Sequence, residues 1–154
     1  MGEGRMTAAT LVRRIAARRS IVFDAFVTPE GLTSWWGPEE FPVISASADV
    51  RVGGHFRVRF KMSDGSEHEC TGEFLDIVKP ERLTMSWRWS EGGEPEERGA
   101  VSRLELHLRA IDTGTELTLI HAALRNEISA RSHEWGWEGA LKKLMRNFAE
   151  THTA

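Results

Sequence analysis

Three of the six histidines and the single cysteine are the side chains that could do chemistry together: His68, Cys70, His121 and His133. Three imidazoles and a thiol could bind zinc, or one imidazole could act as a general base near neutral pH. Only His68 and Cys70 have the close spacing of metal ligands. We therefore expect no metal and no cofactor, and we interpret these groups as hydrogen-bonding parts of a mostly apolar pocket wall.

Two other motifs could contact a ligand, although each has a structural explanation. The segment 35–38 (WWGP) could be an aromatic lid, but indoles more often anchor a short helix by burial. Asp49 and Arg51 could bind a polar ligand group, but we expect them to pair with each other or with a nearby helix end. The glycines at 53 and 54 then supply unusual backbone angles for a turn.

The common catalytic fingerprints are missing from the sequence. It contains no nucleophile elbow and no phosphate-binding loop. Gly53 and Gly54 lie at the start of a predicted strand with no helix after them, so they do not form a dinucleotide-binding motif. An enzyme of the cyclase or hydrolase type that uses the pocket histidines is left as an alternative.

The element that must position His133 is a long helix predicted over residues 129–150. One face of this helix carries side chains at steps of three or four: His133, Trp137, Leu141, Leu144 and Phe148. Charged residues occupy the rest of the helix surface. A helix with one apolar face needs a large apolar partner.

An antiparallel sheet is the predicted partner of this helix. Apolar and polar residues alternate with period two in a series of segments, at 10–17, 55–62, 67–78, 83–90, 103–109 and 117–121. Residues 63–66 are predicted to form a hairpin loop, and the acidic, glycine-rich segment 91–99 a mobile loop.

Two short helices are predicted after the first strand. The first covers residues 20–27 with Ser20 as its cap, and the second begins at Pro29 and stops at Gly37-Pro38. The fold class is therefore α+β, with a curved antiparallel sheet of six to seven strands wrapped on the long C-terminal helix. Residues 10–150 form one domain after a flexible N-terminus at 1–9.

Composition excludes several classes of partner. A net charge of −3 with both signs interspersed gives no basic surface for nucleic acid, and no apolar run is long enough for a membrane span. One cysteine and the lack of a signal-peptide pattern predict a cytoplasmic protein. A homodimer is left open.

Motifs along nearly the whole chain resemble a known family. They include Thr28-Pro29-Glu30, Trp35-Trp36-Gly37-Pro38, Asp49-x-Arg51-x-Gly53-Gly54-x-Phe56, Pro80-Glu81-Arg82-Leu83, Gly114-Thr115-x-Leu117-Thr118-Leu119-x-His121 and His133-x-x-Gly136-Trp137. Together they resemble the activator of heat-shock-protein-90 ATPase homologue-like family, within the START-like (SRPBCC) helix-grip superfamily. The resemblance implies a hydrophobic cavity between sheet and C-terminal helix, with the short helices closing one end. It leaves carrier, enzyme and chaperone-associated functions open.

We expect the chain to bind a hydrophobic or amphipathic small molecule in that cavity, with no established reaction. A chaperone-associated interaction module is a further alternative. The candidate ligand-binding residues, which share the inward face, are Trp36, Phe56, Val58, Phe60, Phe74, Met85, Trp87, Leu106, Leu119, His121, His133, Trp137 and Leu141.

Overall fold

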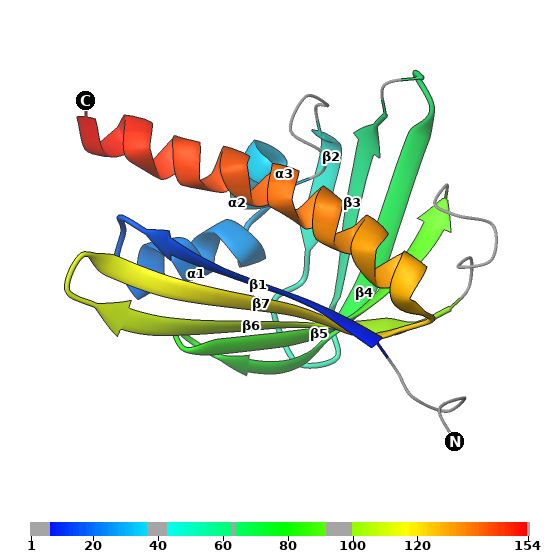
Figure 1. The fold of residues 1–154 in the computed structure, drawn as a ribbon, viewed down its shortest axis with the longest axis horizontal. Helices are drawn as coiled ribbons and strands as arrows, with labels where there is room; N and C mark the ends of the chain where they lie inside the picture. Colours follow the sequence, from blue (N-terminus) through cyan, green and yellow to red (C-terminus); the bar gives the residue numbers. More distant parts are fainter. Residues whose placement is uncertain (1–6, 37–42, 63, 92–99, 154) are drawn as a thin grey trace.

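A computed structural model describes residues 7–36, 43–62, 64–91 and 100–153 (Figure 1). The predicted helix stop at Gly37-Pro38 and almost all of the loop predicted at 91–99 lie outside these residues. So do residues 1–6 of the predicted flexible N-terminus.

Seven strands and three helices make up the described part of the chain. The strands are β1 (Thr7–Ile15), β2 (Val43–Ala48), β3 (His55–Lys61), β4 (Glu67–Val78), β5 (Arg82–Glu91), β6 (Ser102–Ile111) and β7 (Gly114–Leu124). The helices are α1 (Arg19–Val27), α2 (Pro29–Trp35) and α3 (Glu127–Thr153).

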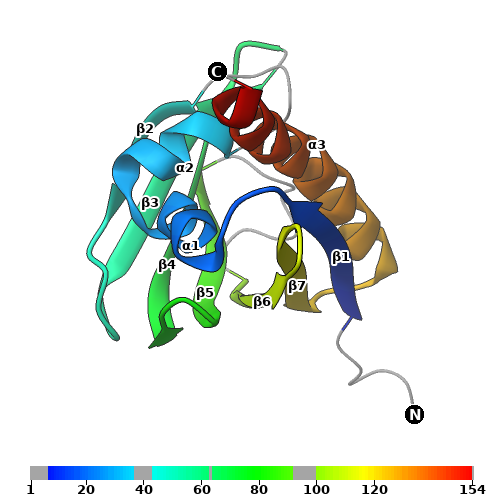
Figure 2. The ribbon, with the colours of Figure 1, turned by 90° about the vertical axis from the view of Figure 1, so that its left-hand side faces the viewer.

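All seven strands join one antiparallel sheet in the order β1-β7-β6-β5-β4-β3-β2. The sheet curves strongly, and α3 runs across its concave side (Figure 2). The short helices α1 and α2 lie at one end of the curved sheet. The predicted α+β architecture of a curved sheet wrapped on a long C-terminal helix is confirmed.

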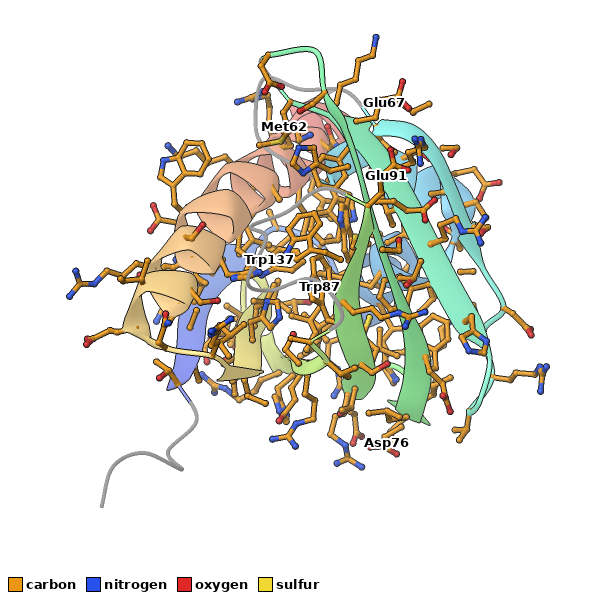
Figure 3. All side chains as sticks on the ribbon, turned by 90° about the vertical axis from the view of Figure 1, so that its right-hand side faces the viewer. Met62, Glu67, Asp76, Trp87, Glu91 and Trp137 are labelled. Carbon is orange, nitrogen blue, oxygen red and sulfur yellow. The ribbon has the colours of Figure 1, made fainter. Side chains whose placement is uncertain are left out.

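Alternation along the strands sorts side chains between the two faces of the sheet as predicted. In β3, Phe56, Val58 and Phe60 are buried on the concave side. On the outer side Arg59 donates to Glu67 at 2.8 Å and to Glu91 at 2.9 and 3.0 Å. Figure 3 shows Glu67 and Glu91 near the same end of β4 and β5. The solvated face is therefore covered by ion pairs, and the apolar face is left for α3.

The kink between the short helices is confirmed at Thr28. Its hydroxyl accepts a hydrogen bond from the Gly31 N–H at 3.0 Å, which caps α2. A Cβ on Gly31 would lie 2.6 Å from the Ala25 Cα, so glycine allows α1 and α2 to close on each other. The predicted Ser20 cap is wrong, because α1 begins one residue earlier and its N-cap residue, Arg18, makes no side-chain cap bond.

Several elements differ from the sequence predictions. β1 starts at Thr7, so the strand includes residues that were expected to be flexible. α3 starts at Glu127, where the Asn126 side chain accepts from the Ser129 N–H at 2.9 Å. β2 was not predicted, because the small and polar residues of its VISASA sequence give no strong apolar alternation.

Candidate functional site

Three tryptophans from three separate elements meet between α3 and the sheet. Trp36 follows α2, Trp87 belongs to β5 and Trp137 to α3. The Trp36 and Trp87 rings stack with centroids 5.3 Å apart, and Trp137 meets them edge-on at 5.2 and 5.3 Å. Figure 3 shows Trp87 and Trp137 side by side in the interior. We call Trp36, Trp87 and Trp137 the tryptophan cluster; its close aromatic contacts fix the distance between α3 and the sheet.

The two indoles of the sequence pair at 35 and 36 have different surroundings. Trp35 is fully buried and its Nε1 donates to the Ala25 carbonyl at 2.7 Å, so it ties α2 to α1. This geometry agrees with the anchoring interpretation of the motif. Trp36 instead contributes to the tryptophan cluster, and its carbonyl accepts from Lys143 Nζ of α3 at 2.9 Å.

His121 of β7 lies beside the tryptophan cluster, and its hydrogen bonds define which ring nitrogen carries the proton. The Trp137 indole donates to His121 Nδ1 at 3.0 Å, and His121 Nε2 lies 2.7 Å from Ser102 Oγ. An indole N–H only donates, so Nδ1 holds the lone pair and the neutral ring carries its proton on Nε2. Burial lowers the pKa of His121 well below the usual histidine value, and His133 lowers it further. His121 cannot accept a substrate proton on Nδ1 without losing the bond to Trp137.

His133 of α3 is the second histidine of the site. Its ring centroid lies 4.6 Å from that of His121, at 69°. Its Nδ1 lies 2.8 Å from the Ser129 carbonyl, an acceptor, so Nδ1 donates this bond. The two imidazoles that the sequence placed on a helix and on a strand are therefore neighbours.

His68 and Cys70 do not join the other two histidines in a metal site. His68 Nε2 lies 3.1 Å from Ser66 Oγ, and the ring stacks on Phe60. The Cys70 thiol is buried at 3.8 Å from the Val58 carbonyl, and burial raises its pKa far above the usual value. Among the described residues, no group of three His, Cys, Asp or Glu side chains is arranged to hold a metal ion.

The predicted pairing of Asp49 with Arg51 is confirmed. Arg51 Nε donates to Asp49 Oδ2 at 2.8 Å, and both side chains are largely exposed. A Cβ on Gly54 would lie 2.0 Å from the Asp49 carbonyl oxygen, while Gly53 has a φ of +89°. The glycines thus serve the turn between β2 and β3.

A small cavity of about 20 Å³ adjoins the tryptophan cluster. Its lining comes from β5, from the start of β6, from the end of β7 and from α3: Trp87, Trp89, Ala100, Val101, Ser102, Ala123, Leu124, Arg125 and His133. We call it the Trp87 cavity. Ala123 has a φ of +59°, a left-handed conformation that side-chain-bearing residues rarely adopt and that often marks functional sites.

One buried polar atom of Trp87, a residue that lines this cavity, lacks a hydrogen-bond partner in the described part of the chain. Among the described residues, Trp87 Nε1 makes no hydrogen bond, although only 4% of the Trp87 surface is exposed. Buried N–H groups are nearly always paired, so an unpaired one needs an explanation. The Trp87 cavity is the space in which a partner could lie.

A second, larger depression of about 230 Å³ lies between α1, α2 and α3. It is lined by Ile21, Asp24, Ala25, Thr28, Gly31, Ser34, Leu144, Asn147 and Phe148. None of the candidate ligand-binding residues lines it.

The structure buries all thirteen candidate ligand-binding residues, and two of them, Trp87 and His133, line the Trp87 cavity. The others pack in the same interior. The ligand-binding residues predicted from the sequence do not include the remaining lining residues: Trp89, Ala100, Val101, Ser102, Ala123, Leu124 and Arg125. Ser102 shares the parity of Leu104 and Leu106, so extending that strand would have found it, whereas nothing in the sequence indicates the Ala123 backbone angle.

Comparisons with known proteins place this geometry in a family. Residues 16–149 match the family described as Activator of Hsp90 ATPase homolog 1-like protein. A crystal structure of a Chromobacterium violaceum protein is 26% identical, covers 92% of this chain and 96% of its own, and gives a TM-score of 0.78.

Two further crystal structures share the fold. A Silicibacter pomeroyi protein described as AHSA1 is 24% identical over 95% of this chain and 100% of its own, with a TM-score of 0.81. A Nitrosomonas europaea protein is 20% identical over 96% and 97%, with a TM-score of 0.78. A search of curated proteins gave no match. In the described residues, no helix has the length and apolar character needed to cross a membrane.

Proposed function

This chain belongs to the Activator of Hsp90 ATPase homolog 1-like family, and we propose that it binds a hydrophobic or amphipathic small molecule between α3 and the concave face of the sheet. The helix-grip fold is consistent with such a role but does not indicate which ligand is bound. The proposal therefore depends on the side chains around the tryptophan cluster.

The observation that carries the proposal is the Trp87 cavity, whose lining includes both an exposed residue and an indole of the tryptophan cluster. Val101, at the outer side of the cavity lining, is 61% exposed, whereas Trp87 is 4% exposed. The same small space thus borders both the surface and a buried indole. In this proposal a terminal ligand group enters from the Val101 side and meets Trp87.

The walls of this cavity suit a mostly apolar ligand. Trp87, Trp89 and Leu124 supply apolar surface, and His121 behind them stays neutral because burial lowers its pKa. Small-molecule sites commonly combine apolar walls with a few convergent polar groups. Ser102, Arg125 and His133 are the polar side chains of the lining.

The cavity volume limits how a ligand fits. A single water needs roughly 10–15 Å³, so about 20 Å³ admits one water or one terminal ligand group. The rest of the ligand lies toward Val101 and against Trp89. Trp89 is half-buried and its ring lies 5.8 Å from Trp87 and 6.3 Å from His133, so its movement would enlarge the space.

Titration with nonan-2-one, followed by calorimetry and tryptophan fluorescence, tests the proposal. Val101→Trp blocks the outer side of the cavity, and we expect it to weaken binding about tenfold, or about 1.4 kcal/mol. Val52→Trp is the matched control, because Val52 is 63% exposed in the turn before β3 and lines neither depression described above. Equal affinity in both variants, or no binding by the unmodified protein, would contradict the proposal.

The enzyme alternative predicts a different outcome of the same experiment. A binding protein returns the ligand unchanged, whereas an enzyme converts it. Mass spectrometry of the ligand recovered after long incubation separates the two. If a product appears, His133→Gln should abolish its formation while leaving the melting temperature nearly unchanged, as expected for a general base.

A further inference from the structure

The unpaired Trp87 N–H indicates which ligand atom the cavity receives. A buried indole N–H can only donate a hydrogen bond, and without an acceptor it loses the bond that it would make in water. The cavity beside it has the volume of about one small polar group. An acceptor that fits this cavity is about the size of one oxygen.

A second donor lies in the same cavity wall. Because His121 Nδ1 accepts from Trp137, the neutral ring donates from Nε2 to Ser102 Oγ at 2.7 Å. The Ser102 hydroxyl hydrogen is then left to donate elsewhere. Its recorded acceptor is the Trp87 carbonyl at 3.4 Å, a long and weak bond. Ser102 can therefore turn its hydrogen toward an oxygen in the cavity.

Two features near the cavity carry positive charge. Arg125 contributes to the lining, and α3 begins two residues later at Glu127. The N-terminal end of a long helix carries partial positive charge. This positive charge would attract an acceptor atom, while the hydrogen bonds themselves would come from Trp87 and Ser102.

We propose that the Trp87 cavity binds the carbonyl-type oxygen of a ketone or a carboxylate, with the Trp87 indole and the Ser102 hydroxyl as its donors. The ligand class is thus an amphipathic molecule with a single accepting head and an apolar tail. This inference rests on the proposed function and makes it more specific.

A pair of isosteric ligands tests the oxygen directly. Nonan-2-one and 2-methylnon-1-ene differ only in a C=O and a C=CH2 group. We expect the unmodified protein to prefer the ketone about tenfold, and Trp87→Phe to weaken ketone binding about tenfold while leaving alkene binding unchanged. Trp135→Phe, at an indole that is 67% exposed, is the control.

The outcomes separate the two proposals. If both ligands bind equally well, or if Trp87→Phe weakens both alike, the oxygen-binding inference is wrong and the proposed function stands. If neither ligand binds, both proposals fail, and the cavity holds a water only. If nonanoate binds more tightly than nonan-2-one at pH 8, the preferred head is a carboxylate; the reverse order identifies a neutral carbonyl.

If Trp87→Phe fails to fold, nuclear magnetic resonance of the unmodified protein still tests whether the Trp87 N–H binds the ligand oxygen. The indole N–H signal of Trp87, assigned by contacts to neighbouring protons, should move downfield when the ketone is added. The alkene should leave it nearly unshifted. A ketone that binds without shifting this signal would overturn the inference.

Discussion

The Trp137 indole donates to His121 Nδ1 at 3.0 Å and thereby joins α3 to β7 inside the protein. Since the indole can only donate, this one bond fixes the tautomer of His121, whose Nε2–H then donates to Ser102 Oγ. A helix and a strand that share a buried hydrogen-bonded chain must keep one relative position. The same chain supplies a donor of the Trp87 cavity.

The stability of the protein should decrease in mild acid because of His121. Its pKa is lowered in the folded state, so the unfolded chain takes up the proton first. The free energy of unfolding should therefore fall by roughly 1.4 kcal/mol per pH unit below about pH 6.5, until the folded-state pKa is reached. Urea denaturation at pH 8, 6.5 and 5.5 measures this loss.

The control for this pH dependence is a pair of glutamine variants. His121→Gln removes the titrating group, so its stability should change less between pH 8 and 5.5. His55→Gln alters an exposed strand residue and should keep the slope of the unmodified protein. Parallel pH profiles for all three proteins would show that His121 is not the cause.

Trp137→Phe should destabilise the fold more than its lost surface alone implies. The substitution removes the N–H, leaves His121 Nδ1 as a buried acceptor without its donor, and opens space in the tryptophan cluster. We expect a loss of about 3 kcal/mol. Trp135→Phe on the exposed face of α3 should change stability by less than about 0.5 kcal/mol. Similar melting temperatures for the two variants would contradict this role for Trp137.

The sequence predicted which face of each helix and strand points inward, but not which inward side chains contact one another. Periods of 3.6 and 2 placed Trp137 and His121 inward, and both are buried. Periodicity does not state which inward residues touch, so the bond between them was not foreseen. Periodicity also could not reveal the positive φ of Ala123 or the unpaired N–H of Trp87. Both are properties of the three-dimensional structure. β2 escaped detection because small and polar residues replace the apolar alternation.

Gly72→Ala should be strongly destabilising even though the change adds one methyl group. A Cβ on Gly72 would lie 1.9 Å from the Ser86 carbonyl oxygen and 2.4 Å from Phe56 Cε1. Phe56 is the strand partner of Gly72 and packs its ring over the glycine. Relief requires movement of both β5 and a core ring, and we expect a cost of about 3 kcal/mol.

Gly136→Ala is the matched control for the clash at Gly72. A Cβ on Gly136 meets nothing within 4 Å, and the residue lies inside α3. This variant should be about 0.5–1 kcal/mol more stable, because alanine favours the helix over glycine. Chemical denaturation of both variants gives the comparison, and a Gly72→Ala protein as stable as the unmodified one would rule out the clash.

Cys70 should resist thiol reagents in the folded protein and react only after unfolding. It is the single cysteine, it is fully buried, and burial raises its pKa, so little reactive thiolate exists in the folded state. Labelling with a disulfide reagent should therefore follow the opening of the structure, and Trp137→Phe should accelerate it by weakening the fold. Ser132→Cys, at an exposed position of α3, supplies a thiol that reacts at once in the folded protein and shows that the reagent is active. Rapid labelling of Cys70 in the unmodified protein without denaturant would contradict this prediction, because it would mean that the thiol is accessible in the folded protein.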